Sequence, residues 1–255
     1  MSRNSFGGFM SSIPPVTKNL IIINVIVWAV EAIFHSFAPR LINVLGLHML
    51  TALKFNPIQL ITYMFLHAPT NPWHLVFNMF ALWMFGSVLE RIWGSKRYFI
   101  FYFVCGIGAA VVQEIVWLST WYHDFISELA RINGMTYAQM KEALPLAIAN
   151  GDIALEQNME MIKNSMVTIG ASGAVYGLLL GYAFVFPNQP LYFFFIPIPI
   201  KAKYMMIGYG VIEFFLGFNG NDTIAHFAHL GGMIFGLILL LYWRKRGTLR
   251  GGTFY

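Results

Sequence analysis

The segment Gly170–Gly177 has the sequence GASGAVYG and places one serine, Ser172, between glycines at the start of an apolar stretch. From Gly173 to Gly181, glycine recurs at every fourth position, a spacing that lets helices pack closely in a membrane. Further along, the segment Ala228–Gly232 (AHLGG) places a histidine near the start of another apolar stretch. A serine and a histidine at the same end of two apolar segments indicate a nucleophile and its general base within a helical membrane protein.

The composition excludes a soluble globular domain. Hydrophobic residues make up 58% of the 255 residues and aromatic residues 17%, charged residues make up only 11%, and the mean hydropathy is +0.63. Soluble domains are about 45–50% apolar and about 25% charged. A chain that crosses a bilayer must satisfy its backbone polar groups internally, which calls for apolar helices of roughly 17–25 residues. We therefore predict an all-α, polytopic membrane protein.

Six apolar stretches are long enough, or nearly long enough, to be transmembrane helices. They are Leu20–Phe37, His74–Leu89, Tyr98–Leu118, Ser172–Phe186, Tyr204–Phe218 and Ala225–Tyr242. No small-residue cleavage site follows the first stretch, so we expect it to be retained as a span rather than removed as a signal peptide. The predicted architecture is a six-helix membrane domain over residues 20–243, with an N-terminal segment at 1–19 and a basic tail at 244–255.

Charge placement predicts the orientation in the membrane, because short cytoplasmic loops collect Lys and Arg. Most of the 16 basic residues fall before the first span, between spans two and three, between spans four and five, or after the sixth. They are Arg3, Lys18, Arg91, Lys96, Arg97, Lys201, Lys203, Arg244, Lys245, Arg246 and Arg250. We therefore expect both termini in the cytoplasm. The expected location of this multi-pass protein is a bacterial inner (plasma) membrane. The net charge of +5 then reflects topology, and we predict no nucleic-acid partner.

Two connections on the outer side are unusually long. Residues 38–73 are apolar but interrupted by prolines, and we expect this connection to lie at the membrane interface. The acidic residues 119–168 are predicted to form two or three short amphipathic helices outside the membrane. Within them, Thr136–Gln139 has the pattern of a capping box, and Asn150–Asp152 has the pattern of a turn into the next helix. A solvated face explains the charges of this insertion, and a partner-binding role is the alternative.

Four polar side chains are expected at one shallow depth below the outer surface. Ser172 begins the fourth span, His229 lies about one turn into the sixth, and His74 and Asn78 begin the second on one helical face. Polar groups in a bilayer are costly and face the interior of a helix bundle, so their convergence favours a functional site. Taken singly, each has a structural explanation in helix packing, an interhelical hydrogen bond or an interfacial position.

The chemistry that suits these residues is acyl transfer. His229 would remove the proton of Ser172, the serine would attack a carbonyl, and the histidine would then protonate the leaving amine. His74, Asn78 and the backbone N–H of Ser172 could stabilise the oxyanion. Glycines at 170 and 173 would let backbone groups come close to the serine.

The sequence identifies no acidic partner for the histidine. Glu31, Glu114 and Glu213 lie in predicted spans, and none of them can be assigned to it. A Ser172–His229 dyad is therefore the simplest interpretation.

These residues resemble the motifs of the rhomboid family of intramembrane serine proteases. The matching pieces are His74-x-x-x-Asn78, Glu90-Arg91-Ile92-Trp93-Gly94, Gly170-Ala171-Ser172-Gly173 with Tyr176, and Ala228-His229-x-x-Gly232-x-x-x-Gly236. Together with six spans in the same order, they cover roughly residues 55–240. One departure is that Ile58 and Gln59 stand near the position of the Trp-Arg pair frequent in the first outer loop of the family.

The resemblance implies a nucleophile at Ser172, a general base at His229, oxyanion contacts from His74 and Asn78, and Tyr176 stacked beside the histidine. It implies cleavage of transmembrane protein substrates near the outer membrane face, with small residues at the scissile bond. The expected partners are these substrates and the lipid bilayer, and neither a metal nor a cofactor is expected. The sequence does not indicate an oligomeric state.

Two other classes of function remain open from sequence alone. A non-catalytic rhomboid-like protein could bind membrane clients, although such proteins usually lack the dyad. A small channel or transporter could use the polar layer for permeation, but it would spread polar residues through the full depth of the bundle, whereas these cluster near one face.

Overall fold

The protein is described by a computed structural model that covers residues 11–34, 36–193, 196–218 and 225–248. Helices dominate it: α2 (Pro15–Ile33), α3 (Ala38–Leu45), α4 (Gln59–Thr62), α5 (Pro72–Ala81), α6 (Ser87–Trp93), α7 (Ser95–Ile132), α8 (Tyr137–Ala149), α9 (Ile153–Ser165), α10 (Ser172–Val185), α11 (Ala202–Leu216) and α12 (His226–Lys245). Shorter elements are the 3₁₀ turn η1 (Tyr63–Phe65), the π-helical turn η2 (Leu82–Gly86) and the strands β1 (Leu47–His48), β2 (Val167–Thr168), β3 (Pro190–Phe193) and β4 (Ile196–Lys201). The outer parts of the predicted cytoplasmic ends, residues 1–10 and 249–255, lie outside the described residues.

Each of the six predicted spans forms a helix, but their lengths differ. In the described part of the chain, four helical stretches are long and apolar enough to cross a membrane: Pro15–Ile33, Pro72–Trp93, Ser95–Ile132 and His226–Lys245. Helices α10 and α11 have only 14 and 15 residues, or about 21–23 Å at 1.5 Å per residue, against about 30 Å for the hydrocarbon core. The structure therefore establishes a helical membrane protein, while the count of six spans remains a prediction.

Two helices have bounds that differ from the predicted spans. The first begins at Pro15 instead of Leu20, because proline at the first helical position is preorganised for a helix start, and it ends at Ile33 instead of Phe37. The third helix does not end at Leu118 but continues to Ile132, a length of about 57 Å. No glycine or proline interrupts it between Gly108 and Gly134, so nothing in the sequence ends the helix at the membrane surface.

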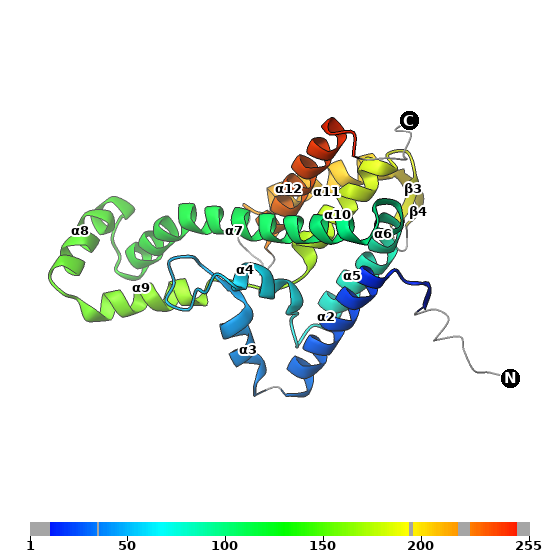
Figure 1. Cartoon of the computed structure of the whole chain (residues 1–255). Helices are drawn as coiled ribbons and strands as arrows, with labels where there is room; N and C mark the ends of the chain where they lie inside the picture. Colours follow the sequence, from blue (N-terminus) through cyan, green and yellow to red (C-terminus); the bar gives the residue numbers. More distant parts are fainter. Residues whose placement is uncertain (1–10, 35, 194–195, 219–224, 249–255) are drawn as a thin grey trace.

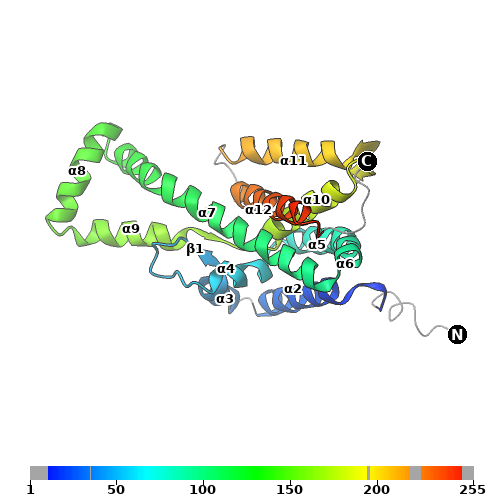
Figure 2. The same cartoon turned by 45° about the horizontal axis from the view of Figure 1, so that its top comes forward.

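The long helix α7 carries an arm that lies beyond the bundle. Figures 1 and 2 show α8 and α9 at its far end, with α9 running back toward β2 and the start of α10. Phe125 and Ile126 of α7 pack with Met140 and Leu144 of α8 in a small separate core. The predicted capping box at Thr136 is confirmed, because its side chain accepts from the backbone of the third helical residue, whose own side chain accepts in return.

The first outer connection folds into a compact layer instead of lying as an irregular loop. It forms α3, β1, α4 and η1, and β1 pairs with β2 through Leu47–Thr168 and His48–Val167. Gln59, at the position of the missing Trp-Arg pair, is buried and makes four hydrogen bonds. It donates to the carbonyl oxygens of Val44 and Lys54 and accepts from the backbone N–H groups of His48 and Asn56. One amide thus anchors this layer next to the segment that leads into α10.

At the opposite end of the bundle, Glu90 ties three helices together. Its carboxylate accepts from the backbone N–H groups of Val16 and Thr17 at 3.0 and 2.8 Å, and from the hydroxyl of Ser95 at 2.7 Å. An anion at these free N–H groups also complements the positive end of the α2 dipole. The start of α2, the end of α6 and the start of α7, all predicted to be cytoplasmic, therefore lie together.

The centre of the bundle is the close packing of α10 against α7 and α12, which confirms the packing role of the glycines. A Cβ atom on Gly232 would overlap the carbonyl oxygen of Gly173, and one on Gly177 would overlap the side chain of Cys105. The backbones of α10 and α12 therefore touch directly. Because Ser172 and His229 lie within one turn of this contact, it also sets the distance between them.

We expect Gly232→Ala to lower the thermal stability of the purified protein strongly, because overpacking a dense interface costs roughly 1–3 kcal/mol or more and here the obstacle is backbone. Gly208→Ala is the matched control. Gly208 lies within α11, and no atom of the described residues would come within 4 Å of an added Cβ. The control should be neutral or more stable, by up to about 1 kcal/mol from helix propensity. Equal melting temperatures for the two variants would contradict the packing described here.

Candidate active site

Ser172 is the first residue of α10, and Gly170 shapes the turn that precedes it. Gly170 has φ +130, a conformation that residues with a side chain rarely adopt, and its N–H donates to the carbonyl of Tyr63 at 2.9 Å. An added Cβ would lie 2.9 Å from Nε2 of His74. Gly170 is therefore required both by its backbone conformation and by the closeness of His74.

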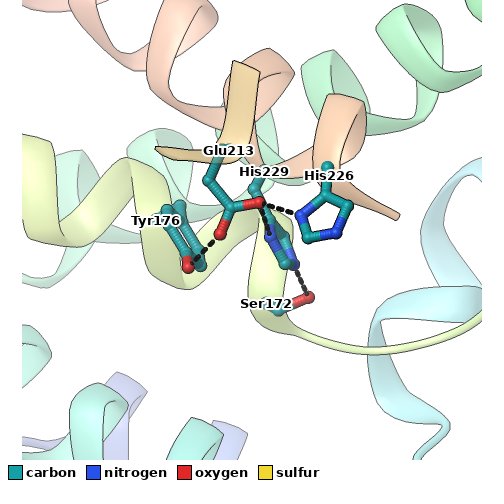
Figure 3. A network of polar contacts seen from close by, with 5 residues as sticks. All are labelled: Ser172, Tyr176, Glu213, His226 and His229. Atoms are coloured by element: carbon teal, nitrogen blue, oxygen red, sulfur yellow. Dashed lines mark hydrogen bonds and ion pairs between the residues drawn. The ribbon is translucent and has the colours of Figure 1, made fainter. Parts of the chain in front are cut away.

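The structure brings Ser172 and His229 into direct contact, as predicted. Nε2 of His229 lies 2.8 Å from Oγ of Ser172 (Figure 3). The histidine is on the first turn of α12 and is 8% exposed, whereas the serine is half-buried. The serine hydroxyl is thus within hydrogen-bond distance of a base while remaining reachable.

Tyr176 lies one turn after Ser172 on α10 and stacks on the imidazole of His229. The two ring centroids are 4.2 Å apart and the ring planes differ by 6°. This contact is the one that the family resemblance implied. Stacking opposes tilting of the imidazole out of this plane, so it helps to keep Nε2 directed at the serine.

His74 faces the same turn, and the position of its proton follows from its neighbours. The backbone N–H of Ala68 donates to Nδ1 of His74 at 3.4 Å. A neutral imidazole with an acceptor at Nδ1 carries its proton on Nε2, which is the nitrogen near Gly170. His74 therefore presents an N–H donor toward the backbone just before Ser172.

Asn78 is buried one turn further along α5. Its Nδ2 donates to the carbonyl oxygen of His74 at 2.7 Å, within the same helix. The second N–H of the amide is the one that an oxyanion would use. The structure thus places both predicted oxyanion residues on one face of α5, with His74 nearer to the serine turn.

Sequence reasoning missed the acidic residue beside the histidine, which is Glu213 of α11. Its Oε2 lies 3.0 Å from Nδ1 of His229 and 2.6 Å from Nδ1 of His226, and its Oε1 accepts from the hydroxyl of Tyr176 (Figure 3). His226 is also buried, with 5% of its surface exposed.

The signal for Glu213 was present in the topology. If α11 runs outward, Glu213 falls near its outer end, at the depth of Ser172 and His229. The other two carboxylates of the predicted spans have different partners: Glu114 accepts from the N–H of Leu50, and Glu31 accepts from the N–H of His67. What the sequence could not supply is the side-by-side placement of α11 and α12.

Glu213, His226 and His229 have the ligand types that bind divalent cations, and one donor atom of each lies within 4.8 Å of the others. Both Nδ1 atoms, however, are already in direct contact with the carboxylate. A cation would have to replace these contacts. The arrangement fits a polar network around a histidine better than a preformed metal site.

A family model described as the Rhomboid domain matches residues 54–122 and 147–246. The chain belongs to the rhomboid family. The matched ranges of this rhomboid contain every residue of the network, and they leave out 123–146, the outer end of α7 with most of α8. The resemblance inferred from the short motifs is therefore confirmed.

Curated relatives carry the same family name. The chain is 27% identical over 176 residues to Rhomboid protein 1, mitochondrial, of Saccharomyces cerevisiae. The aligned residues cover 68% of this chain and 38% of the yeast protein. Two Arabidopsis thaliana proteins also match: RHOMBOID-like protein 12, mitochondrial (26% over 175 residues, 68% of this chain and 42% of theirs), and Rhomboid-like protein 16, chloroplastic (25% over 187 residues, 73% and 49%). The chain spans less than half the length of these relatives, whose names place them in organelles.

We expect Gly170→Ala to reduce turnover of a transmembrane substrate by about 10²-fold, because the side chain would strain the turn and displace His74 from the serine. Gly151→Ala is the matched control. Gly151 also has a positive φ, of +75, but it lies in the outer arm with no atom of the described residues near an added Cβ. It should cost roughly 1–2 kcal/mol of local stability and leave turnover unchanged. Equal turnover by both variants would argue against a role for this turn.

Proposed function

We propose that this rhomboid is an intramembrane serine endopeptidase that cleaves transmembrane protein substrates near the outer face of the membrane. The observation that carries the proposal is the 2.8 Å contact between Oγ of Ser172 and Nε2 of His229 at the start of two apolar helices. The family membership supports the protein class, and the geometry supports the activity.

In the proposed reaction, His229 accepts the hydroxyl proton of Ser172 as the serine oxygen attacks the scissile carbonyl. The resulting oxyanion is stabilised by backbone N–H groups at the start of α10, which have no acceptor within the helix, and by the N–H of His74. Asn78 can contribute its second amide N–H. The imidazolium then donates its proton to the leaving amine, and a water molecule, activated by the same histidine, hydrolyses the acyl-enzyme.

Substrate would approach from the lipid along α11. An apolar groove of about 570 Å³ lies between this helix and α10 and α12, lined by Leu180, Met206, Val211, Leu230 and Met233. The outer face of α11 is itself apolar and exposed, with Ile207 63% and Phe215 67% exposed. A transmembrane substrate helix could lie in this groove and reach the catalytic pair at Leu230, which directly follows His229 in the chain. Small residues at the scissile bond would suit the close backbone packing around Gly170 and Gly173.

The proposed orientation has both termini in the cytoplasm and the α8–α9 arm outside, in a bacterial inner membrane. The helix ends that carry basic residues gather around Glu90, and the polar layer with Ser172 lies toward the other end of the bundle. This arrangement is consistent with the proposed orientation. In this orientation cleavage would release the outer domain of a substrate.

We expect Ser172→Ala and His229→Ala each to abolish cleavage of a transmembrane substrate in liposomes, since each removes one partner of the proton transfer. A fluorophosphonate probe should label the wild type and not Ser172→Ala. Ser87→Ala is the matched control, because Ser87 is another serine of the membrane helices, buried in α6. Cleavage by a folded Ser172→Ala protein would refute the proposal, and a wild type that binds substrate without cleaving it would favour a client-binding protein.

We expect cross-linking through introduced cysteines to place the substrate helix on α11. In a background with Cys105→Ala, which removes the single cysteine, cysteines at Val211 or Phe214 should form adducts with a substrate helix. Cysteines at Ile22 or Ile26, which are exposed on α2, serve as controls for non-specific contact through lipid. Adducts confined to α2 would place substrate entry on the opposite side.

A further inference from the structure

Glu213 occupies an unusual position on its helix. The neighbouring residues Ile212 and Phe214 are 54% and 47% exposed on an apolar surface, whereas Glu213 is only 6% exposed. Its carboxylate points inward, to the place where α10, α11 and α12 meet (Figure 3). A carboxylate buried in an apolar bundle is expensive unless it has partners, so those partners indicate its role.

We propose that Glu213 positions His229 for catalysis, so that the site is a Ser172–His229–Glu213 triad with its members on three helices. This inference rests on the proposed function and adds a residue to its machinery. It carries the assignment beyond the two residues that the sequence motifs indicated.

The atoms of the three side chains lie in the order that a triad requires. Oε2 of Glu213 lies 3.0 Å from Nδ1 of His229, and Nε2 of the same ring lies 2.8 Å from Oγ of Ser172. A carboxylate beside Nδ1 favours the tautomer with the proton on that nitrogen. Nε2 is then free of a proton and can accept the hydroxyl proton of the serine. The carboxylate would thus select the tautomer that a general base needs.

The carboxylate of Glu213 is itself held in place. The hydroxyl of Tyr176 donates to Oε1, and Nδ1 of His226 lies 2.6 Å from Oε2. An ionised carboxylate has about four acceptor sites, so it can receive both of these donors and His229 as well. Tyr176 also stacks on His229, so one residue aligns both the acid and the imidazole.

Glu213 also places a negative charge beside the imidazole. Nδ1 of His229 lies within ion-pair distance of Glu213. The N–H at this nitrogen does not point at the carboxylate well enough to form a hydrogen bond, and Nδ1 has no other hydrogen-bond partner among the described residues. In this geometry the carboxylate acts chiefly through its charge. It would stabilise the imidazolium that forms when Ser172 transfers its proton, and this stabilisation is strong where water is largely excluded.

The competing role for Glu213 is structural, since its contacts also attach α11 to the bundle. The carboxylates of Glu114 and Glu31 are of this kind, since each accepts from a backbone N–H in the outer layer. Glu114→Gln therefore provides a matched control. It makes the same isosteric change to a carboxylate that is equally buried, at 6% exposed, but that lies on α7 and accepts from the N–H of Leu50.

The first measurement is the kinetics of substrate cleavage in liposomes. Glu213→Gln should lower kcat by on the order of 10²- to 10³-fold, somewhat less than the roughly 10⁴-fold loss known for soluble triads, because the contact is not aligned. Its KM should stay within about threefold of the wild-type value, and its rate of fluorophosphonate labelling should fall in parallel with kcat. Glu114→Gln should retain kcat. A Glu213→Gln kcat within about twofold of this control would overturn the proposal.

The second measurement distinguishes the positioning of His229 from the attachment of α11 to the bundle. In protein labelled with ¹⁵N-histidine, the His229 signals can be assigned by their loss in His229→Ala. Wild type and Glu114→Gln should show the proton of His229 on Nδ1, whereas Glu213→Gln should show an increased fraction on Nε2. A loss of kcat in Glu213→Gln with an unchanged tautomer would mean that Glu213 does not set the tautomer of His229, which would overturn its proposed positioning role.

The proposed function and the triad can be refuted separately. If wild-type protein shows no cleavage or labelling that depends on Ser172, the proposed function fails. The tautomer measurement is independent of activity, so a change of tautomer in Glu213→Gln would still support the positioning contact. If activity depends on Ser172 but neither kcat nor the tautomer responds to Glu213→Gln, the triad alone is refuted.

Discussion

The contact on which the structure depends is the backbone approach of α10 to α12 at Gly173 and Gly232. No side chain separates the two helices there, because a Cβ on Gly232 would overlap the Gly173 carbonyl. Ser172 immediately precedes one glycine, and His229 lies one turn before the other. Wider packing would separate Oγ from Nε2 beyond the observed 2.8 Å. The glycine pattern and the reactive pair are therefore two consequences of one constraint, that of holding rigid helices at minimal distance in a medium that supplies no hydrophobic force between them.

Buried polar groups supply the second level of organisation. Gln59 anchors the outer layer, Glu90 joins the ends of α2, α6 and α7 that are predicted to be cytoplasmic, and Glu213 joins α10, α11 and α12. Each is satisfied by several partners, as the low dielectric of an apolar bundle requires. Gln59 and Glu90 bond mainly to backbone groups and to a serine, which suits a structural role. Glu213 differs because its partners are two imidazoles and a phenol, groups that can move or direct a proton.

The sequence allowed the membrane class, the six helical segments, the Ser172–His229 pair and the stacking of Tyr176 to be predicted, the last through a family resemblance. These features depend on the length of the apolar segments and on the local spacing of residues, which can be read directly from the sequence. It did not allow the end of α7 or the start of α2 to be predicted, because helix ends depend on local stop and start signals that hydropathy does not measure. The outer connection was predicted as an interfacial loop, yet one buried glutamine and a short β-pairing to residues more than a hundred positions away organise it.

What the sequence alone determined, then, is which helices exist, which of their ends share a depth, and which residue types at that depth can perform acyl transfer. What only the tertiary structure decided is which side chains meet across helices. Glu31, Glu114 and Glu213 were equivalent from the sequence, and α11 was only a short apolar stretch. Their partners differ because helix rotation and neighbour order are set by packing over the whole bundle. Hydropathy fixes how deep a residue lies, but only the packed helices fix the direction in which it points.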